Sequence, residues 1–169
     1  MKNLLLSFLF CLLLCNVNAQ TPYTVSPDPK TGGKVYQGVI NKYTLQNDKT
    51  FNWYASGQSG YSPEMKILTA FETAKTSVHF ILFGGTWCDD TQYILPKFFK
   101  IQELSGFPDS AVSFYGVDRD KKTIGNISHA FNITNVPTII IMKEGKEIGR
   151  VVEYGKTGKW DMEIAEMLK

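Results

Sequence analysis

Residues 86–96 read TWCDDTQYILP and place the pair Trp87-Cys88 where an apolar strand gives way to a helix. Residues 78–83 (VHFILF) form a near-continuous apolar run, which is typical of a central strand covered on both faces. A helix is expected over 88–104, and its first turn would direct unpaired backbone N–H groups at the sulfur of Cys88. This arrangement favours the thiolate and makes Cys88 a candidate reactive residue.

The residues after Cys88 define which chemistry is open to it. Asp89 and Asp90 stabilise the start of the helix electrostatically, but as like charges they oppose the thiolate. Thr91 stands where a second cysteine would close an internal disulfide with Cys88. It either donates its hydroxyl to the sulfur or is a tolerated surface residue. The function is therefore argued from one thiol.

Residues 1–19 are expected to be a secretory signal peptide. Lys2 supplies the basic start, residues 4–15 form the apolar core, and Val17 and Ala19 are the small residues before a cleavage site. The apolar core has about 12 residues, too few for a helix that crosses a hydrocarbon layer of roughly 30 Å. We expect cleavage after Ala19 and a protein that is periplasmic or secreted.

A lipoprotein signal with Cys15 as the acylated residue is the alternative. It is less favoured because that signal needs a small residue before the cysteine, and Leu14 is large. Cleavage after Ala19 would remove both Cys11 and Cys15. Cys88 would then be the single cysteine of the mature chain, and an odd cysteine in an exported protein suggests a reactive thiol or a bond to another molecule.

Residues 20–61 are expected to form an N-terminal arm and extension. Prolines and glycines punctuate residues 20–33, which predicts a poorly ordered arm. Residues 35–40 have the pattern of a short strand. An aromatic cluster follows, which we interpret as packing against the main domain, with an aromatic binding surface as the alternative; its members are Phe51, Trp53, Tyr54 and Tyr61.

Residues 62–169 have regular punctuation and are expected to form one α/β domain. The expected elements are helix 62–75, strand 78–83, helix 88–104, strand 111–117, helix 123–131, strands 138–142 and 147–152, and helix 157–168. This order predicts a central mixed sheet of about four strands between helices.

Order and punctuation together resemble the thioredoxin-like superfamily. Trp87-Cys88 lies at the strand-to-helix junction, Pro96 follows in the helix, and Val136-Pro137-Thr138 looks like the family's cis-proline loop. Gly145 falls at the turn of the last hairpin. The run GTWCDDTQ, together with GVDRD and NVPT, resembles a group of exported bacterial thioredoxin-family proteins whose chemistry is poorly defined. The chain carries WCDDT in place of the family's WCxxC.

The resemblance implies a cis Val136–Pro137 bond and a loop that faces Cys88. Thioredoxins proper often hold a buried aspartate where this chain has Leu82, and that acid moves protons for the second cysteine. The chain lacks both the acid and the second thiol, so efficient protein-disulfide reduction by the dithiol route is not expected.

Other constellations are weaker. Asp118-Arg119-Asp120 follows an expected strand, and Arg119 either assists Cys88 or a partner or pairs with one of its neighbouring aspartates. His79 is expected in the core or at an edge, and His129 on the surface. One cysteine and two scattered histidines are too few for a metal site, and no cofactor is expected.

Partners are expected to be protein or small-molecule disulfides and thiols, glutathione among them. A homodimer through Cys88 is also open. The formal net charge of +2, without a long run of one sign, does not point to nucleic acid, and the mature chain is expected to have no membrane span. Two function classes remain: a monothiol thiol–disulfide oxidoreductase with an external resolving thiol, and a non-catalytic peptide-binding or protein-binding module.

Overall fold

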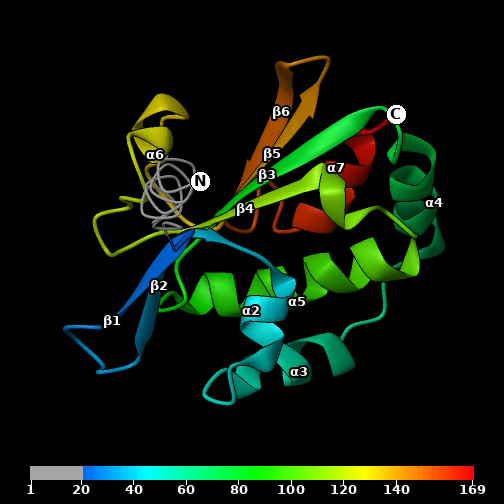
Figure 1. Ribbon diagram of the computed structural model, residues 1–169. Helices are drawn as coiled ribbons and strands as arrows, with labels where there is room; N and C mark the ends of the chain where they lie inside the picture. The colour runs from blue at the N-terminus through cyan, green and yellow to red at the C-terminus, as the bar shows by residue number, and fades with distance from the viewer. Residues whose placement is uncertain (1–20) are drawn as a thin grey trace, which may run out of the picture.

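The computed structural model describes residues 21–169 as one six-stranded mixed sheet in the order β1-β2-β4-β3-β5-β6, with helices on both faces (Figure 1). The elements are β1 (Tyr23–Pro27), β2 (Lys34–Ile40), α2 (Lys42–Asn47), α3 (Asn52–Ser59), α4 (Met65–Ala74), β3 (Val78–Gly84), α5 (Asp89–Leu104), β4 (Val112–Gly116), α6 (Ile127–Ala130), β5 (Thr138–Lys143), β6 (Lys146–Val152) and α7 (Trp160–Met167).

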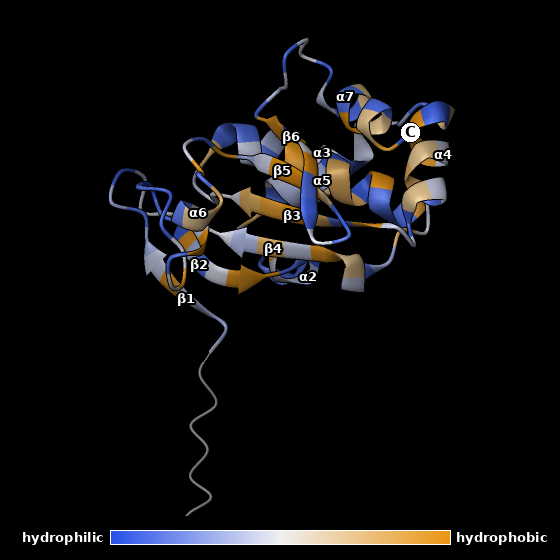
Figure 2. Ribbon diagram, turned by 90° about the horizontal axis from the view of Figure 1, so that it is seen from above, coloured by the Kyte–Doolittle hydropathy of each residue, from blue (hydrophilic) through white to orange (hydrophobic). Residues whose placement is uncertain are grey.

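The strand before the cysteine lies at the centre of the sheet. β3 pairs parallel with β4 and antiparallel with β5, and Leu82 stands opposite Phe114 on one side and Ile139 on the other. Figure 2 shows β3 and β5 as hydrophobic strands in the middle of the molecule. The predicted central strand and the α/β thioredoxin-like fold are confirmed.

The two faces of the sheet are covered unequally. The larger core lies under α3, α4, α5 and α7, where the rings of Phe71, Phe80 and Phe98 stack edge to face or in parallel. The opposite face carries a small cluster around Phe83 and Ile140, beside the short α6. Helix α5, which begins directly after Cys88, therefore packs on the face that carries the larger core.

The prediction of a poorly ordered arm over residues 20–33 is wrong. Residues Tyr23–Pro27 form β1, which pairs antiparallel with β2, and β2 pairs antiparallel with β4. The predicted strand at 35–40 is confirmed. Gly116 allows the close approach of β2, because a Cβ atom there would collide with the carbonyl of Tyr36. The four expected strands are all present, and the N-terminal extension adds two more.

The aromatic segment packs against the main domain, as interpreted. Phe51 and Tyr54 are buried, and the Tyr54 ring lies 6.3 Å from that of Phe99 on α5. Gly57 lets α3 lie close to α5, because an added Cβ would stand 3.0 Å from Pro96. The N-terminal extension thus shares the core of residues 62–169.

Several helices are shorter than expected. The helix expected over 123–131 covers Ile127–Ala130, and the one expected over 157–168 begins at Trp160. The loop before α7 is not helical for two reasons. Gly158 has a φ of 76°, and the backbone N–H groups of Lys156 and Thr157 donate to the carboxylate of Glu163. None of the helices within residues 21–169 is long and apolar enough to cross a membrane. The predicted signal peptide at 1–19, with Cys11 and Cys15, lies outside the described residues.

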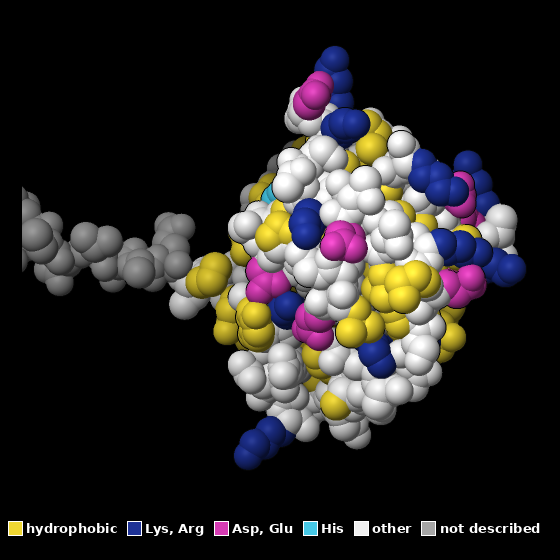
Figure 3. Space-filling view, turned by 90° about the vertical axis from the view of Figure 1, so that its right-hand side faces the viewer, with side chains coloured by type: hydrophobic (Ala, Val, Ile, Leu, Met, Phe, Trp, Pro, Cys, Tyr) yellow, Lys and Arg dark blue, Asp and Glu magenta, His cyan; other side chains and the backbone are white. Residues whose placement is uncertain are grey.

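On the face shown in Figure 3, acidic and basic side chains are interspersed in small groups among polar and apolar ones. This face presents no large area of one charge.

Candidate active site around Cys88

Cys88 is the N-cap residue of α5 and is partly exposed. Its Sγ donates to the carbonyl oxygen of Val136 at 3.2 Å, and its own carbonyl accepts from the N–H of Gln92. The sulfur is thus held between the first turn of a helix and the loop that opens β5. Within residues 21–169, Cys88 is the only cysteine.

The loop that faces Cys88 contains a cis Val136–Pro137 peptide bond, as predicted. The hydroxyl of Thr138 donates to the carbonyl of Asn135 at 2.7 Å, and the carbonyl of Pro137 accepts from the N–H of Glu153 at 2.7 Å. These bonds tie the loop to the first residue of β5 and to the residue that follows β6. The loop of Val136, Pro137 and Thr138 is therefore fixed, and its Val136 carbonyl is the group that contacts the sulfur.

Thr91 is buried, so the interpretation of a tolerated surface residue is wrong. Its Oγ1 accepts a hydrogen bond from the backbone N–H of Gly85 at 3.2 Å, in the loop that precedes the cysteine. Its methyl group packs closely on Gly84, where an added Cβ would come within 2.9 Å of Thr91 Cγ2. Thr91 thus holds the backbone of Gly84 and Gly85, which leads from β3 to Cys88.

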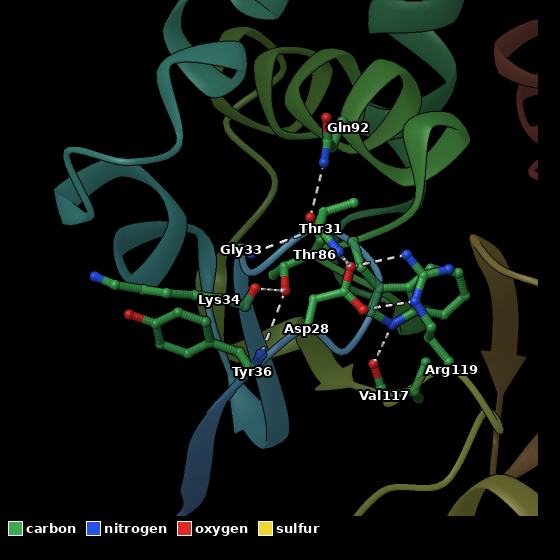
Figure 4. Close-up of polar contacts among 10 residues, drawn as sticks. Asp28, Thr31, Gly33, Lys34, Tyr36, Thr86, Gln92, Val117 and Arg119 are labelled. Atoms are coloured by element: carbon green, nitrogen blue, oxygen red, sulfur yellow. Dashed lines mark hydrogen bonds and ion pairs between the residues drawn. The ribbon is translucent and has the colours of Figure 1, made fainter.

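Leu82, which stands where thioredoxins proper often hold a buried aspartate, is itself buried in the larger core. Thr86 joins the same loop to the N-terminal extension: its hydroxyl donates to the carbonyl of Lys34 at 2.7 Å and accepts from the N–H of Tyr36. Gln92 donates to the carbonyl of Thr86 from the other side (Figure 4). The loop before Cys88 is therefore anchored by β2 and by α5.

Trp87 lies against the loop after β4. Its indole Nε1–H donates to the carbonyl of Val117 at 2.9 Å, and the guanidinium of Arg119 lies 4.7 Å from the centre of its ring. Arg119 pairs with Asp28, so the expectation that it pairs with Asp118 or Asp120 is wrong.

The two neighbouring aspartates have other partners. The carboxylate of Asp118 accepts from the Gln37 side chain and from the N–H of Lys122. Asp120 lies 3.6 Å from the ammonium group of Lys122. The contacts of Asp118 therefore hold the loop, whereas Asp120 makes only a long contact at the surface, and Arg119 pairs with Asp28 instead.

Asp89 and Asp90 lie in the first turn of α5, as predicted, but face different surroundings. Asp90 accepts a hydrogen bond from the hydroxyl of Tyr154 at 3.0 Å, and burial together with this bond raises the pKa of Tyr154 to about 12. Asp89 lines a pocket of about 440 Å³ next to Trp87, whose other walls include Trp53 and Gln92. Tyr154 and this pocket were not predicted, because their parts lie far apart in the sequence.

The histidines have the placement expected for ordinary structural residues. His79 lies in β3, its Nε2 is 2.9 Å from the hydroxyl oxygen of Ser113, and burial lowers its pKa. His129 lies at the end of α6. Within residues 21–169, no three His, Cys, Asp or Glu side chains gather as a metal site would require.

The family model described as Thioredoxin matches residues 67–166 of the chain. This match covers more than half of the chain, so the chain belongs to the thioredoxin family, whose members act on protein thiols and disulfides.

Relatives show the same family. The chain is 32% identical over 99 residues to a thioredoxin-like protein of Acanthamoeba polyphaga mimivirus, covering 56% of this chain and 69% of that protein. It is 28% identical over 91 residues to thioredoxin-1 of Saccharomyces cerevisiae, covering 53% and 82% of the two chains. Among solved structures, an HIV epitope-scaffold shares the fold, with a TM-score of 0.54 at 13% identity over 77% of this chain and 90% of the scaffold.

Proposed function

We propose that this protein is a monothiol thiol–disulfide oxidoreductase that works through Cys88. The observation that carries the proposal is the placement of one partly exposed sulfur between a helix N-terminus and the cis-proline loop, with a buried threonine at the position of the second thiol. Thr91 has no sulfur with which to close an internal disulfide. A bond formed by Cys88 must therefore be resolved from outside.

The reaction has two balanced exchanges. The Cys88 thiolate attacks one sulfur of a disulfide, a new S–S bond forms as the old one breaks, and the departing sulfur leaves as a thiolate that takes a proton from solvent. An external thiolate, such as glutathione, then attacks the mixed disulfide and releases Cys88. Proteins and small molecules that carry disulfides are the proposed substrates.

Turnover of a small disulfide separates this function from binding alone. Purified protein is mixed with hydroxyethyl disulfide and reduced glutathione, and the 2-mercaptoethanol released is separated and quantified for wild type and for Cys88→Ser, because the exchange leaves the total amount of thiol unchanged. Catalytic turnover in wild type and none in Cys88→Ser is expected. A stable mixed disulfide without turnover would contradict the proposal and favour a module that holds its partners.

We also infer that the protein is exported and begins at Gln20 when mature. The support is the pattern of residues 1–19, with a basic start, an apolar core and small residues before Gln20. N-terminal sequencing of the protein from its native host checks it. A chain that retains Cys15, or carries lipid on it, would overturn this inference.

A further inference from the structure

An ion pair joins the N-terminal extension to the active-site loop. The Asp28 side chain has no exposed surface and accepts from Nε of Arg119 at 2.6 Å and from Nη2 at 2.8 Å. Two parallel N–H···O bonds of this kind fix the orientation of a guanidinium as well as its position.

Asp28 is itself held rigidly within its loop. The hydroxyl and the backbone N–H of Thr31 both donate to Oδ2 of Asp28, at 2.5 Å and 3.1 Å. The backbone N–H of Asp28 donates to the carbonyl of Gly33, and that of Gly32 donates to the carbonyl of Asp28. These bonds fix the carboxylate within its own loop, where Arg119 meets it (Figure 4).

The guanidinium lies over the indole of Trp87, the residue that precedes Cys88. A cation over a tryptophan face is attracted by the ring, so Arg119 and the Val117 carbonyl fix the indole from two sides. The bonds that Arg119 donates to Asp28 raise the pKa of Arg119, so the guanidinium stays charged. Because Trp87 directly precedes Cys88, this cation lies in the immediate neighbourhood of the sulfur.

We propose that Arg119, oriented by Asp28, is a positioning residue of the Cys88 site. It fixes Trp87 beside the sulfur and supplies the positive charge that stabilises the Cys88 thiolate before attack on a disulfide. Arg119 makes and breaks no covalent bond in the exchange. This inference rests on the proposed function and adds that the N-terminal extension is part of the active site.

Other charged groups around the sulfur make the effect of Arg119 measurable. The two carboxylates in the first turn of α5 oppose the thiolate, and the phenol of Tyr154, with its pKa raised to about 12, is neutral near pH 7. Without Arg119, less positive charge near the sulfur would offset the two carboxylates, and the thiolate would be less stable. The groups that face the site are Asp89 and Asp90 on α5, Arg119 and Lys121 after β4, Tyr154 after β6, and Asp28 from the N-terminal extension.

The test is the rate of Cys88 alkylation by iodoacetamide as a function of pH, since only the thiolate reacts. Arg119→Gln is expected to move the midpoint of this profile upward and to slow alkylation by about 3- to 10-fold below the midpoint, which corresponds to up to about one pK unit. The rate at the high-pH plateau is expected to stay unchanged. Arg119→Lys keeps the charge and should restore part of the shift, and Asp28→Asn should give an intermediate one.

Arg150→Gln is the matched control, because Arg150 forms the same two-bond pair with Glu147 on β6. Its alkylation profile should equal that of wild type. If Arg119→Gln is folded and its profile also equals that of wild type, the ion pair is only a tether and the inference is overturned. If Arg119→Gln does not fold, a profile of Asp28→Asn that equals that of wild type overturns it instead. Alkylation requires no turnover, so a failure of the proposed oxidoreductase activity is seen separately.

Discussion

At the scale of single residues, Thr91 takes the place of a second thiol and gives that place a structural task. Its hydroxyl accepts from Gly85, so the loop that leads to Cys88 is fixed by the helix that follows it. A thiol is a weaker acceptor than a hydroxyl. A cysteine at position 91 would therefore hold this loop less firmly than the threonine does.

Thr91→Cys is expected to create an internal disulfide with Cys88. The two positions adjoin across one helical turn, and side chains so placed come within disulfide reach. Intact mass after mild oxidation should show the loss of two hydrogens, and insulin reduction by dithiothreitol should rise. The reduced variant should lose about 1–3 kcal/mol of unfolding free energy, because the buried N–H of Gly85 loses its acceptor.

Asp90→Cys is the control, since residues two apart do not share a helix face and should form no such bond. If Thr91→Cys forms the bond and stays inert, the site holds partners and does not turn them over. If no bond forms, position 91 does not correspond to the second cysteine of the family.

At the scale of elements, α2 and α3 fill the space beside α5 that the predicted four-stranded domain leaves open. Leu45 on α2 has no exposed surface and belongs to the same core as Phe99 of α5. The ring of Tyr54 on α3 lies 6.3 Å from that of Phe99 in the same core. The extension thus contributes to the hydrophobic core and is more than a tether.

Leu45→Ala should lower the free energy of unfolding by about 2–5 kcal/mol, as large-to-small changes in a packed core do. Urea unfolding followed by tryptophan fluorescence measures the change. Val25→Ala on β1, where the side chain is exposed, is the control and should cost much less. An equal effect of the two substitutions would mean that α2 packs only loosely on the core.

At the scale of the whole molecule, the Asp28–Arg119 pair makes stability depend on pH. Arg119 holds the pKa of the Asp28 carboxyl well below its usual range. The charged pair stabilises the fold fully above the unfolded pKa of about 3.9 and loses its effect as the pH falls towards the lower folded value.

The difference in urea midpoint between wild type and Asp28→Asn is therefore expected to be largest above about pH 5 and to shrink at lower pH. A series of urea titrations measures it. Asp120→Asn is the control, because Asp120 is exposed and its contact with Lys122 is long. A difference between wild type and Asp28→Asn that stays constant with pH would contradict the assignment of this pair.

A chain that starts at Ser62 should fail to give a stable monomer. Removing β2 would turn β4 into an open edge, and exposed edges favour association with other chains. It would also uncover the α5 surface that Tyr54 covers. Size-exclusion chromatography and urea unfolding measure the outcome, and a monomer with the stability of the full chain would show that residues 62–169 are self-sufficient.

The sequence by itself determined the features that depend on neighbouring residues. The apolar run at 78–83, the cysteine at the start of α5 and the valine–proline pair at 136–137 each carry their pattern within a few residues. Periodicity and turn chemistry specify such elements locally, which is why the central strand and the α/β class were predictable. The loop that faces Cys88 was implied by the resemblance to the thioredoxin-like superfamily.

Only the tertiary structure decided how the N-terminal extension completes the sheet and the site. Prolines and glycines made residues 20–33 look like an arm, but β1 is ordered by backbone bonds to β2, and β2 in turn by bonds to β4. Asp28 and Arg119 are 91 residues apart, and nothing in either neighbourhood predicts their pairing. Sheet-edge pairing and buried ion pairs depend on which surfaces remain open after the core has formed, and that is a property of the folded molecule.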